Sequence, residues 1–308
     1  MRPPLRLLVA HPDGDTAQAW QAALSAALPQ AQVEPWQPDS APADYAVGWA
    51  VQPALFATQP ALKAFFCAGA GVDDLLASAA VPPQLPLLRI EDAGMGEQMA
   101  DYCTAAVLGW FTRRDDYARQ QAQGQWRELP QEHRADWPIG VFGLGALGGV
   151  VLRRFEQLGF PVQGCSRALL ASGAVTLEAF LRRSRVLILL APLTAQTRGL
   201  FNAQRLAWLP RGACLINVAR GALVDEAAVL AALDSGQLAA AQLDVFATEP
   251  LPAGHPFWQH PRVCLTPHAA AYTVIGPAAT QIVRRIRQLA QGRDVQEITG
   301  WVRRDRGY

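Results

Sequence analysis

A glycine-rich turn constrains the fold of this 308-residue chain more than any other feature. The run Gly143-Leu144-Gly145-Ala146-Leu147-Gly148 follows directly on the apolar stretch Ile139–Phe142 and opens a helical pattern over Gly149–Leu158. In a dinucleotide-binding turn of this spacing, the first glycine permits a tight turn, the second lets the backbone approach a pyrophosphate, and the third lets helix and strand pack closely. The helix N-terminus also attracts the phosphates. The run therefore predicts a βαβ unit that binds a dinucleotide, and a glycine-rich turn without a ligand is the alternative.

The next expected strand, Val162–Cys165, indicates which dinucleotide binds. Enzymes that use NAD usually place an Asp or Glu about 20 residues further on, where it binds the ribose 2′-hydroxyl. Here the strand ends in Ser166-Arg167, and no carboxylate occurs between Glu156 and Glu178. A hydroxyl and a guanidinium can both hydrogen-bond a 2′-phosphate. We therefore expect NADPH, and whether NADH is also accepted stays open; the alternative is an exposed loop arginine.

Apolar runs and helical patterns alternate along two stretches of the chain, which predicts parallel sheets. The first series is Leu5–Ala10, Thr16–Leu28, Asp44–Trp49, Leu62–Ala68 and Leu87–Ile90. In the second series, strands are expected at Ile139–Phe142, Val162–Cys165, Val186–Leu190, Ala213–Val218, Ala239–Val245 and Val263–Thr266. Glu97–Gln123, which has no proline, favours one long helix between the two series, and Pro277–Gln291 predicts a last helix that returns to the first.

This pattern predicts an α/β fold with two Rossmann-like or flavodoxin-like domains, parallel sheets and an active-site cleft between the domains. Residues 1–96 with 280–308 would form a substrate-binding (catalytic) domain, and residues 97–279 a dinucleotide-binding Rossmann domain. A chain of 308 residues is long enough for two such cores.

Composition excludes several classes of function. The net charge is +1 with both signs interspersed, so we expect neither a nucleic-acid nor a membrane partner. The five cysteines are odd in number and form no C-x-x-C pair, which is typical of reduced thiols in the cytoplasm and implies no metal site.

The apolar stretches are also too short for a leader or a membrane span. The N-terminal one is interrupted by His11-Pro12, and Val186–Leu193 falls far below the ~20 residues that cross a bilayer. We therefore expect a cytoplasmic protein.

Three polar residues, Arg220, Glu249 and His268, follow the last three expected strands, where open α/β sheets place their ligands. Reduction of a 2-oxo acid needs a cation for the carboxylate, an acid for the developing alkoxide, and a group that keeps the acid charged. Arg220 can supply the bidentate contact, His268 the proton, and Glu249 the orientation and charge of His268. Each residue alone could instead have a structural role. His268 could be a structural histidine after a strand, Glu249-Pro250 could form a turn, and Arg220-Gly221 could form a surface corner. The other histidines, His11, His133, His255 and His260, are interpreted as surface or packing residues.

Three motifs together resemble the D-isomer-specific 2-hydroxyacid dehydrogenases: Asn217-Val218-Ala219-Arg220-Gly221, Leu243–Pro250 and Thr266-Pro267-His268. Gly69–Asp73, Glu91–Met99 and Asp305–Tyr308 further resemble the glyoxylate/hydroxypyruvate reductase A subgroup. The resemblance covers nearly the whole chain. It implies an NADP-type cofactor, reduction of glyoxylate to glycolate and of hydroxypyruvate to D-glycerate, a homodimer formed through the long helix 97–123, and a cleft that closes on the substrate.

The resemblance also implies a set of binding residues. The backbone N–H groups of Gly71 and Val72 should bind the substrate carboxylate with Arg220, while Trp49 and Met95 wall a small pocket; for Trp49, core packing is the alternative. Besides the glycines and Ser166-Arg167, cofactor contacts are expected at Ala146, Leu147, Pro192, Val218, Ala219 and Asp244. The chain departs from its relatives after Arg167, where Ala-Leu-Leu-Ala-Ser-Gly lacks a further basic residue, so selectivity for NADPH is expected to be weaker.

Two other functions stay open. One is reduction of a bulkier 2-oxo acid, with a phenyl or branched side chain. The other is cofactor sensing by a binding protein, because transcriptional corepressors that resemble this family keep the same fold and catalytic residues.

Overall fold

The computed structural model describes residues 4–49 and 52–308. The chain divides into two compact units: unit 1 runs to Gly94 and resumes over Thr273–Tyr308, and unit 2 is Met95–Tyr272. The divisions therefore fall after residues 94 and 272, where the sequence suggested 96 and 279. The second one comes earlier because the last helix, α11 (Ile275–Ala290), packs as a whole against α1 (Gly14–Ala27) of unit 1.

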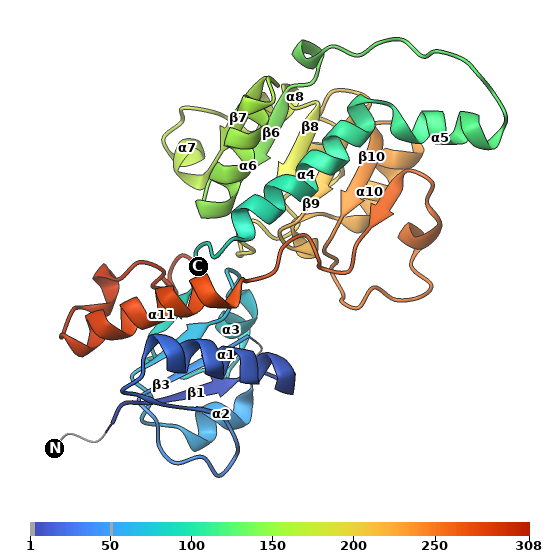
Figure 1. The fold of residues 1–308 in the computed structure, drawn as a ribbon. Helices are drawn as coiled ribbons and strands as arrows, with labels where there is room; N and C mark the ends of the chain where they lie inside the picture. The colour runs from blue at the N-terminus through green and yellow to red at the C-terminus, as the bar shows by residue number, and fades with distance from the viewer. Residues whose placement is uncertain (1–3, 50–51) are drawn as a thin grey trace. The chain divides into compact units, whose positions relative to one another are not determined.

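Unit 1 is a five-stranded parallel sheet in the order β2-β1-β3-β4-β5 (Figure 1). Its strands are β1 (Arg6–Ala10), β2 (Gln32–Pro35), β3 (Tyr45–Gly48), β4 (Ala64–Cys67) and β5 (Leu87–Arg89). Its other helices are α2 (Pro53–Thr58), α3 (Asp73–Ala77) and the 3-10 turn η4 (Val295–Glu297). This strand order is flavodoxin-like, and it reverses between β1 and β3, so the segments after these strands lie where such sheets bind ligands.

The central strands form because their apolar runs are buried on both faces: β3 and β4 are buried at every position. The stretch Leu62–Ala68 of the first series contains β4. Strand β2 was not expected, because Gln32-Val33-Glu34-Pro35 has no apolar run. It lies at the sheet edge, where polar residues and a proline are tolerated.

Unit 2 is a six-stranded parallel sheet in the order β11-β10-β9-β8-β6-β7. Its strands are β6 (Ile139–Phe142), β7 (Val162–Cys165), β8 (Val186–Leu189), β9 (Ala213–Asn217), β10 (Leu238–Leu243) and β11 (Val263–Leu265). All six expected strands are present within two residues of their expected ends. The strand order reverses between β6 and β8, which puts the switch point of this sheet at the glycine-rich turn.

The helices of unit 2 are α4 (Met95–Phe111), α5 (Arg114–Ala122), α6 (Ala146–Gln157), α7 (Arg167–Ala171), α8 (Leu177–Arg182), α9 (Ala203–Leu206) and α10 (Glu226–Asp234), with 3-10 turns η1 (Arg134–Asp136), η2 (Gly221–Leu223) and η3 (Pro256–Gln259). Successive residues of β8 point to opposite faces of the sheet and pack into two different hydrophobic cores. Val186 and Ile188 pack with α4 and α6, whereas Leu187 and Leu189 pack with α8, α9 and α10. Helices therefore cover both faces of the sheet.

The single long helix expected over 97–123 is wrong, because the structure has two helices there. Helix α4 ends at Phe111, and α5 starts at Arg114 after Arg113, whose φ of 57° is left-handed. The α4 sequence buries an apolar face against α6, whereas Arg-Asp-Asp-Tyr-Ala-Arg-Gln-Gln-Ala of α5 has almost no apolar residue to bury. The break carries no glycine or proline, so the sequence pattern did not show it.

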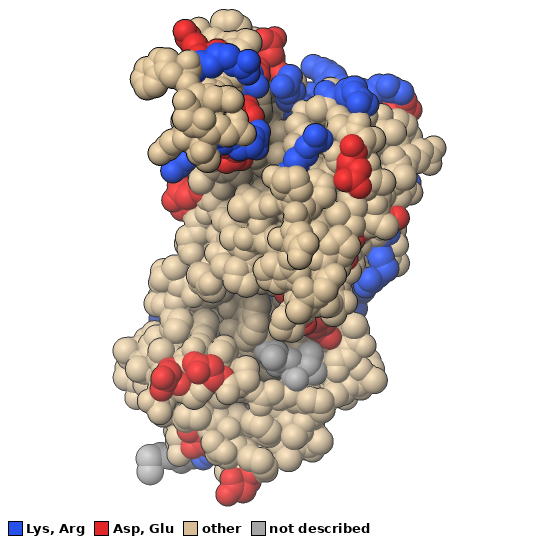
Figure 2. Space-filling view, turned by 90° about the vertical axis from the view of Figure 1, so that its right-hand side faces the viewer, with Lys and Arg blue, Asp and Glu red and all other residues tan. Residues whose placement is uncertain are grey.

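In the upper part of the face drawn in Figure 2, lysine and arginine side chains lie close to aspartate and glutamate side chains, whereas the lower part shows mainly aspartate and glutamate. Within α5 and at its N-cap, Arg113 and Arg119 both contact Asp116, at 3.0 and 2.5 Å. Within residues 4–49 and 52–308, no helix combines the length and the apolar character that a membrane span requires.

Four of the five cysteines are buried and Cys264 is exposed, and none of the five forms a disulfide. Burial raises the pKa of Cys165 to about 11 and that of Cys214 to about 12. These side chains therefore act as small core residues, as the apolar runs around them predict.

Candidate active site

The glycine-rich turn between β6 and α6 is fixed by steric contacts at two of its three glycines. Gly143 has a φ of 112°, and a Cβ there would lie 2.5 Å from backbone atoms of Leu190 and Ala191. A Cβ at Gly148 would collide with the carbonyl oxygen of Gly143. At Gly145, by contrast, a Cβ would meet nothing within 4 Å. Packing thus demands the first and third glycines, whereas the second one faces open space at the start of α6.

The N-terminus of α6 fits a phosphate group. Gly145 is the N-cap and provides no side-chain cap, and helix geometry leaves the first backbone N–H groups, including those of Ala146 and Leu147, without partners inside the helix. Gly145 and Ala146 are exposed and Leu147 is half-buried, so this end of the helix is accessible. Donors and a helix dipole directed into open space are what a pyrophosphate requires.

The neighbouring strand ends supply the remaining expected cofactor contacts. Ser166 caps α7, its Oγ accepting from Leu169 N at 3.3 Å, and Arg167 is exposed directly beyond it. Pro192, after β8, is exposed, and its carbonyl accepts from Thr197 Oγ1 at 2.8 Å. Val218 and Ala219, after β9, are buried. All of these residues follow the carboxyl ends of β7, β8 and β9 in one sheet.

Arg220 is held at the end of β9 by its neighbours. The buried Asn217 donates from Nδ2 to the carbonyl of Arg220 at 3.0 Å and accepts from Ala219 N at 3.2 Å. The guanidinium Nη1 donates to the Ala219 carbonyl at 2.7 Å. A Cβ at Gly221 would collide with the backbone of Phe246, so a glycine there lets the Arg220 turn approach the segment after β10.

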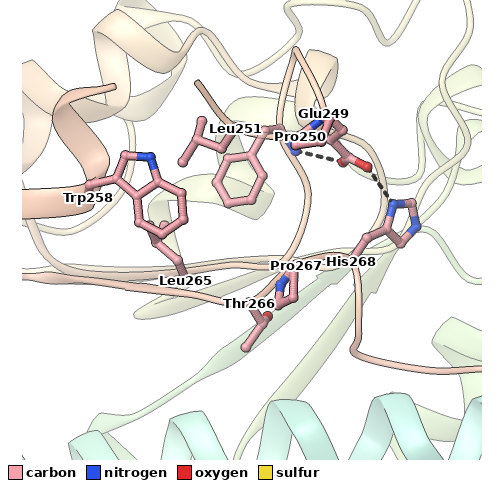
Figure 3. A pocket seen from close by; sticks show the side chains of 9 residues that line it. Glu249, Pro250, Leu251, Trp258, Leu265, Thr266, Pro267 and His268 are labelled. Carbon is pink, nitrogen blue, oxygen red and sulfur yellow. Dashed lines mark hydrogen bonds and ion pairs between the residues drawn. The ribbon is translucent and has the colours of Figure 1, made fainter. Parts of the chain in front are cut away.

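Glu249 and His268 form a hydrogen-bonded pair (Figure 3). Glu249 Oε2 lies 2.8 Å from His268 Nδ1, and its Oε1 accepts from the backbone N–H of Phe246 at 3.0 Å. Both side chains are partly exposed, 36% for Glu249 and 40% for His268. A carboxylate held at one oxygen by the backbone orients the imidazole with the other, which is how a general acid is kept in one position.

An apolar cavity of about 580 Å³ adjoins this pair, and Leu251, Trp258, Leu265 and Pro267 are among its lining residues. In Figure 3 the second ring nitrogen of His268 points away from Leu251 and Trp258. This nitrogen therefore faces away from the apolar wall.

The backbone of His268 adopts an unusual conformation, with a φ of 54°. Asp244, after β10, holds it there: its carbonyl accepts from His268 N at 2.8 Å, and its carboxylate accepts from Ala269 N at 2.7 Å and Ala270 N at 3.0 Å. Asp244 is 1% exposed. A cofactor contact at Asp244 stays a prediction; in this structure its carboxylate binds the His268 loop.

A second histidine also lies near a carboxylate. His255 Nε2 is 3.6 Å from Glu226, and its Nδ1 accepts from Phe257 N at 3.3 Å at the start of η3. Both ring nitrogens are thus engaged in local structure. Over residues 4–49 and 52–308, His, Cys, Asp and Glu side chains form no group of three suited to a metal ion.

The other predicted substrate contacts lie at strand ends of unit 1 and at the start of unit 2. Trp49 follows β3, is 44% exposed, and lies over Gly69, where a Cβ would collide with its ring. It is therefore not a core residue. Gly71 and Val72 follow β4 and precede α3, whereas Met95 is buried at the first position of α4.

Comparison with known proteins places this geometry in a family. Residues 104–270, more than half of the chain, match the family model of the D-isomer specific 2-hydroxyacid dehydrogenase NAD binding domain. The chain belongs to this family. It is thus an NAD(P)-dependent oxidoreductase, and the resemblance seen in the sequence motifs is confirmed.

Solved structures agree over the whole length of this dehydrogenase. A D-isomer specific 2-hydroxyacid dehydrogenase from Xanthobacter autotrophicus Py2, in complex with NADPH and MES, is 37% identical with a TM-score of 0.88, and the match covers 98% of this chain and 100% of that one. An NADPH-dependent glyoxylate/hydroxypyruvate reductase from Sinorhizobium meliloti, in complex with NADP and sulfate, is 31% identical with a TM-score of 0.87, over 99% and 100% of the two chains. The two parallel sheets match the fold expected from the sequence.

For two residues that hold Arg220 in place, no role was predicted from the sequence. Asn217 and Gly221 occur in the same five-residue motif as Arg220, and a buried amide and a close backbone approach give them their roles. Their place in that motif was a signal that could have been used.

Proposed function

We propose that this dehydrogenase is an NADPH-dependent reductase of small 2-oxo acids that converts glyoxylate to glycolate and hydroxypyruvate to D-glycerate. The observation that supports it best is the 2.8 Å contact between His268 Nδ1 and Glu249, in a loop beside the strand end that bears Arg220. The 31% identity to the Sinorhizobium meliloti glyoxylate/hydroxypyruvate reductase supports the choice of substrates.

In the proposed mechanism His268 is the general acid. In the imidazolium form of His268, Nδ1 donates to Glu249 and Nε2 carries a second proton; this Nε2 proton goes to the developing alkoxide of the substrate and leaves His268 neutral. Arg220 binds the substrate carboxylate through its guanidinium, and the backbone N–H groups of Gly71 and Val72 add to this contact. Trp49 and Met95 limit the size of the pocket. When bound, NADPH supplies the hydride that the keto carbon accepts.

In this proposal unit 2 is the dinucleotide-binding domain and unit 1 the substrate-binding one. The start of α6 would hold the pyrophosphate at Gly143, Gly145 and Gly148 with the N–H groups of Ala146 and Leu147. Arg167 and Ser166 would hold the 2′-phosphate. Pro192, Val218 and Ala219 would line the nicotinamide end. Asp244 would act through the His268 loop.

We also propose that the enzyme is a homodimer that works in the cytoplasm, with an interface formed by the 97–123 region and by the exposed segment that follows it. Almost every residue from Gln121 to Asp136 is exposed, and Trp126 is fully exposed, at 103%. A large aromatic side chain left in solvent often marks an interaction site. Analytical ultracentrifugation should give twice the mass of one chain, and Trp126→Ser should shift the equilibrium toward monomer; a monomeric wild-type protein would contradict the dimer.

The experiment that tests the function measures NADPH oxidation with a series of 2-oxo acids, from glyoxylate and hydroxypyruvate to phenyl and branched-chain acids, repeated with NADH. We expect the highest kcat/KM with the two smallest acids and NADPH. A maximum at a bulky acid would replace the substrate proposal and keep the reaction class. Tight NADPH binding without turnover on any acid would instead favour a cofactor-sensing protein.

A further inference from the structure

Four polar side chains form a hydrogen-bonded chain in unit 2, and three of them, Tyr102, Gln242 and Thr266, have no role in the proposed mechanism. Tyr102 Oη, on α4, lies 2.5 Å from Gln242 Nε2 of β10 and 2.5 Å from Thr266 Oγ1, just beyond β11. Thr266 Oγ1 in turn lies 2.5 Å from Asp244 Oδ1. Gln242 and Asp244 are buried, so water does not compete for these contacts. The chain joins a helix to the ends of two strands that are more than a hundred positions away in the sequence.

The chemistry of the four groups allows only one order of donors and acceptors along these hydrogen bonds. An ionised carboxylate only accepts, so the Thr266 hydroxyl donates to Asp244. Since that hydroxyl has a single proton, its oxygen must accept from Tyr102, and the Tyr102 oxygen then accepts from the Gln242 amide. The order is therefore Gln242 to Tyr102 to Thr266 to Asp244. Hydrogen bonds aligned in this way polarise and strengthen one another.

The acceptor end of the chain is the residue that shapes the His268 loop. Asp244 binds the backbone N–H groups of His268, Ala269 and Ala270, and it does so while His268 has a left-handed backbone. Such a backbone costs of order 1–3 kcal/mol in a residue other than glycine and persists only where its surroundings hold it. The carboxylate of Asp244 holds Ala269 and Ala270, so a shift of this carboxylate would move the backbone next to His268 and, through it, the imidazole.

We propose that Tyr102 is a positioning residue for His268, acting through Thr266 and Asp244 to keep the imidazole aligned with Glu249 and with the substrate. This inference rests on the proposed role of His268 as the general acid. The Tyr102 hydroxyl contacts Gln242 and Thr266, so its effect on His268 passes through the Asp244 carboxylate.

The environment of Tyr102 keeps its hydroxyl protonated, so that it can always donate a hydrogen bond. Burial is the largest influence on the hydroxyl and raises the pKa of Tyr102 to about 12, so the phenol keeps its proton at any pH at which the enzyme works. The ring itself packs against the core between α4 and the sheet. Tyr102→Phe consequently removes the donor and keeps the packing.

The first test compares Tyr102→Phe with Tyr45→Phe, which removes the hydroxyl of a buried tyrosine in β3 of unit 1. We expect Tyr102→Phe to lower kcat about ten-fold, the scale of one hydrogen bond, with the KM for NADPH unchanged. The NMR chemical shifts of the His268 ring should move in Tyr102→Phe and stay in place in Tyr45→Phe. Wild-type kcat together with wild-type His268 shifts in Tyr102→Phe would overturn the proposal.

A second pair of variants covers the case in which Tyr102→Phe fails to fold. Thr266→Val interrupts the chain at its middle member, and Thr266→Ser keeps the hydroxyl. We expect Thr266→Val to lower kcat and shift the His268 resonances as Tyr102→Phe does, Thr266→Ser to restore both, and the double variant to be no worse than either single one. Equal effects of Thr266→Val and Thr266→Ser on kcat would contradict the proposed hydrogen-bonded chain. So would additive effects of Tyr102→Phe and Thr266→Val in the double variant.

The ring shifts also separate this inference from the proposed function. If His268→Gln keeps full turnover, the assignment of the acid fails, whereas a movement of the His268 shifts in Tyr102→Phe would still show that Tyr102 positions the ring. If His268→Gln abolishes turnover and Tyr102→Phe moves neither kcat nor the shifts, only the inference about Tyr102 fails.

Discussion

The glycine-rich turn 143–148 and the His268 loop 266–270 both follow strands of the same sheet, yet they are held in opposite ways. The turn is shaped by steric contacts within one βαβ unit and the segment after β8. The loop is shaped by hydrogen bonds that its backbone N–H groups donate to Asp244. The Asp244 carboxylate also accepts from Thr266, which contacts Tyr102 on a helix 164 positions away. A local constraint can be read from a short motif, whereas a long-range one cannot.

This difference decides how much the sequence predicted. The turn, the six strands of unit 2 and the order Arg220, Glu249, His268 were all identified from runs of a few residues. The edge strand β2 was missed because its sequence is mainly polar, and the break before α5 because Arg113 takes a left-handed φ that its residue type rarely adopts. The role of Tyr102 could not be predicted from the sequence, because only the folded sheet brings α4 next to Thr266.

The largest expected effect concerns the loop. His268→Gln should lower kcat by about 10²–10⁴, the usual contribution of a general acid, and leave NADPH binding unchanged, because the turn is a separate structure. Steady-state assays and fluorescence titration with NADPH measure the two quantities. His255→Gln, at the other histidine near a glutamate, is the matched control and should keep kcat. Full turnover in His268→Gln would show that another group is the general acid.

Arg220→Lys tests the strand end between the two regions. It keeps the charge and loses the planar pair of donors, so kcat/KM for glyoxylate should fall by roughly 10–100-fold, mainly through KM. Arg182→Lys, at an exposed arginine that pairs with Glu178, is the control and should behave as wild type. An unchanged KM in Arg220→Lys would show that the carboxylate is bound by other groups.

Two alanine substitutions test whether the turn is governed by sterics alone. Gly148→Ala places a methyl group against the Gly143 carbonyl and should lower the free energy of unfolding by about 1–3 kcal/mol. Gly145→Ala enters open space, so it should keep the stability and raise the Kd for NADPH. Thermal melts and NADPH titrations separate these effects. Equal stability losses in both variants would contradict the distinction between the glycines.

The smallest effect is expected at Arg167. Arg167→Asp should raise the KM for NADPH by about ten-fold, the loss of one charged hydrogen-bonding partner, and change the KM for NADH little. The NADH assay serves as the internal control. Parallel changes with both cofactors would show that Arg167 does not recognise the 2′-phosphate.

The most direct test of the reductase proposal follows the hydrogen itself. The enzyme is incubated with glyoxylate and NADPH that bears two deuterium atoms at nicotinamide C4, and the product is analysed by mass spectrometry. Transfer to the keto carbon predicts glycolate with a single deuterium at C2. Consumption of NADPH with unlabelled glycolate, or no consumption with any small 2-oxo acid, would contradict it.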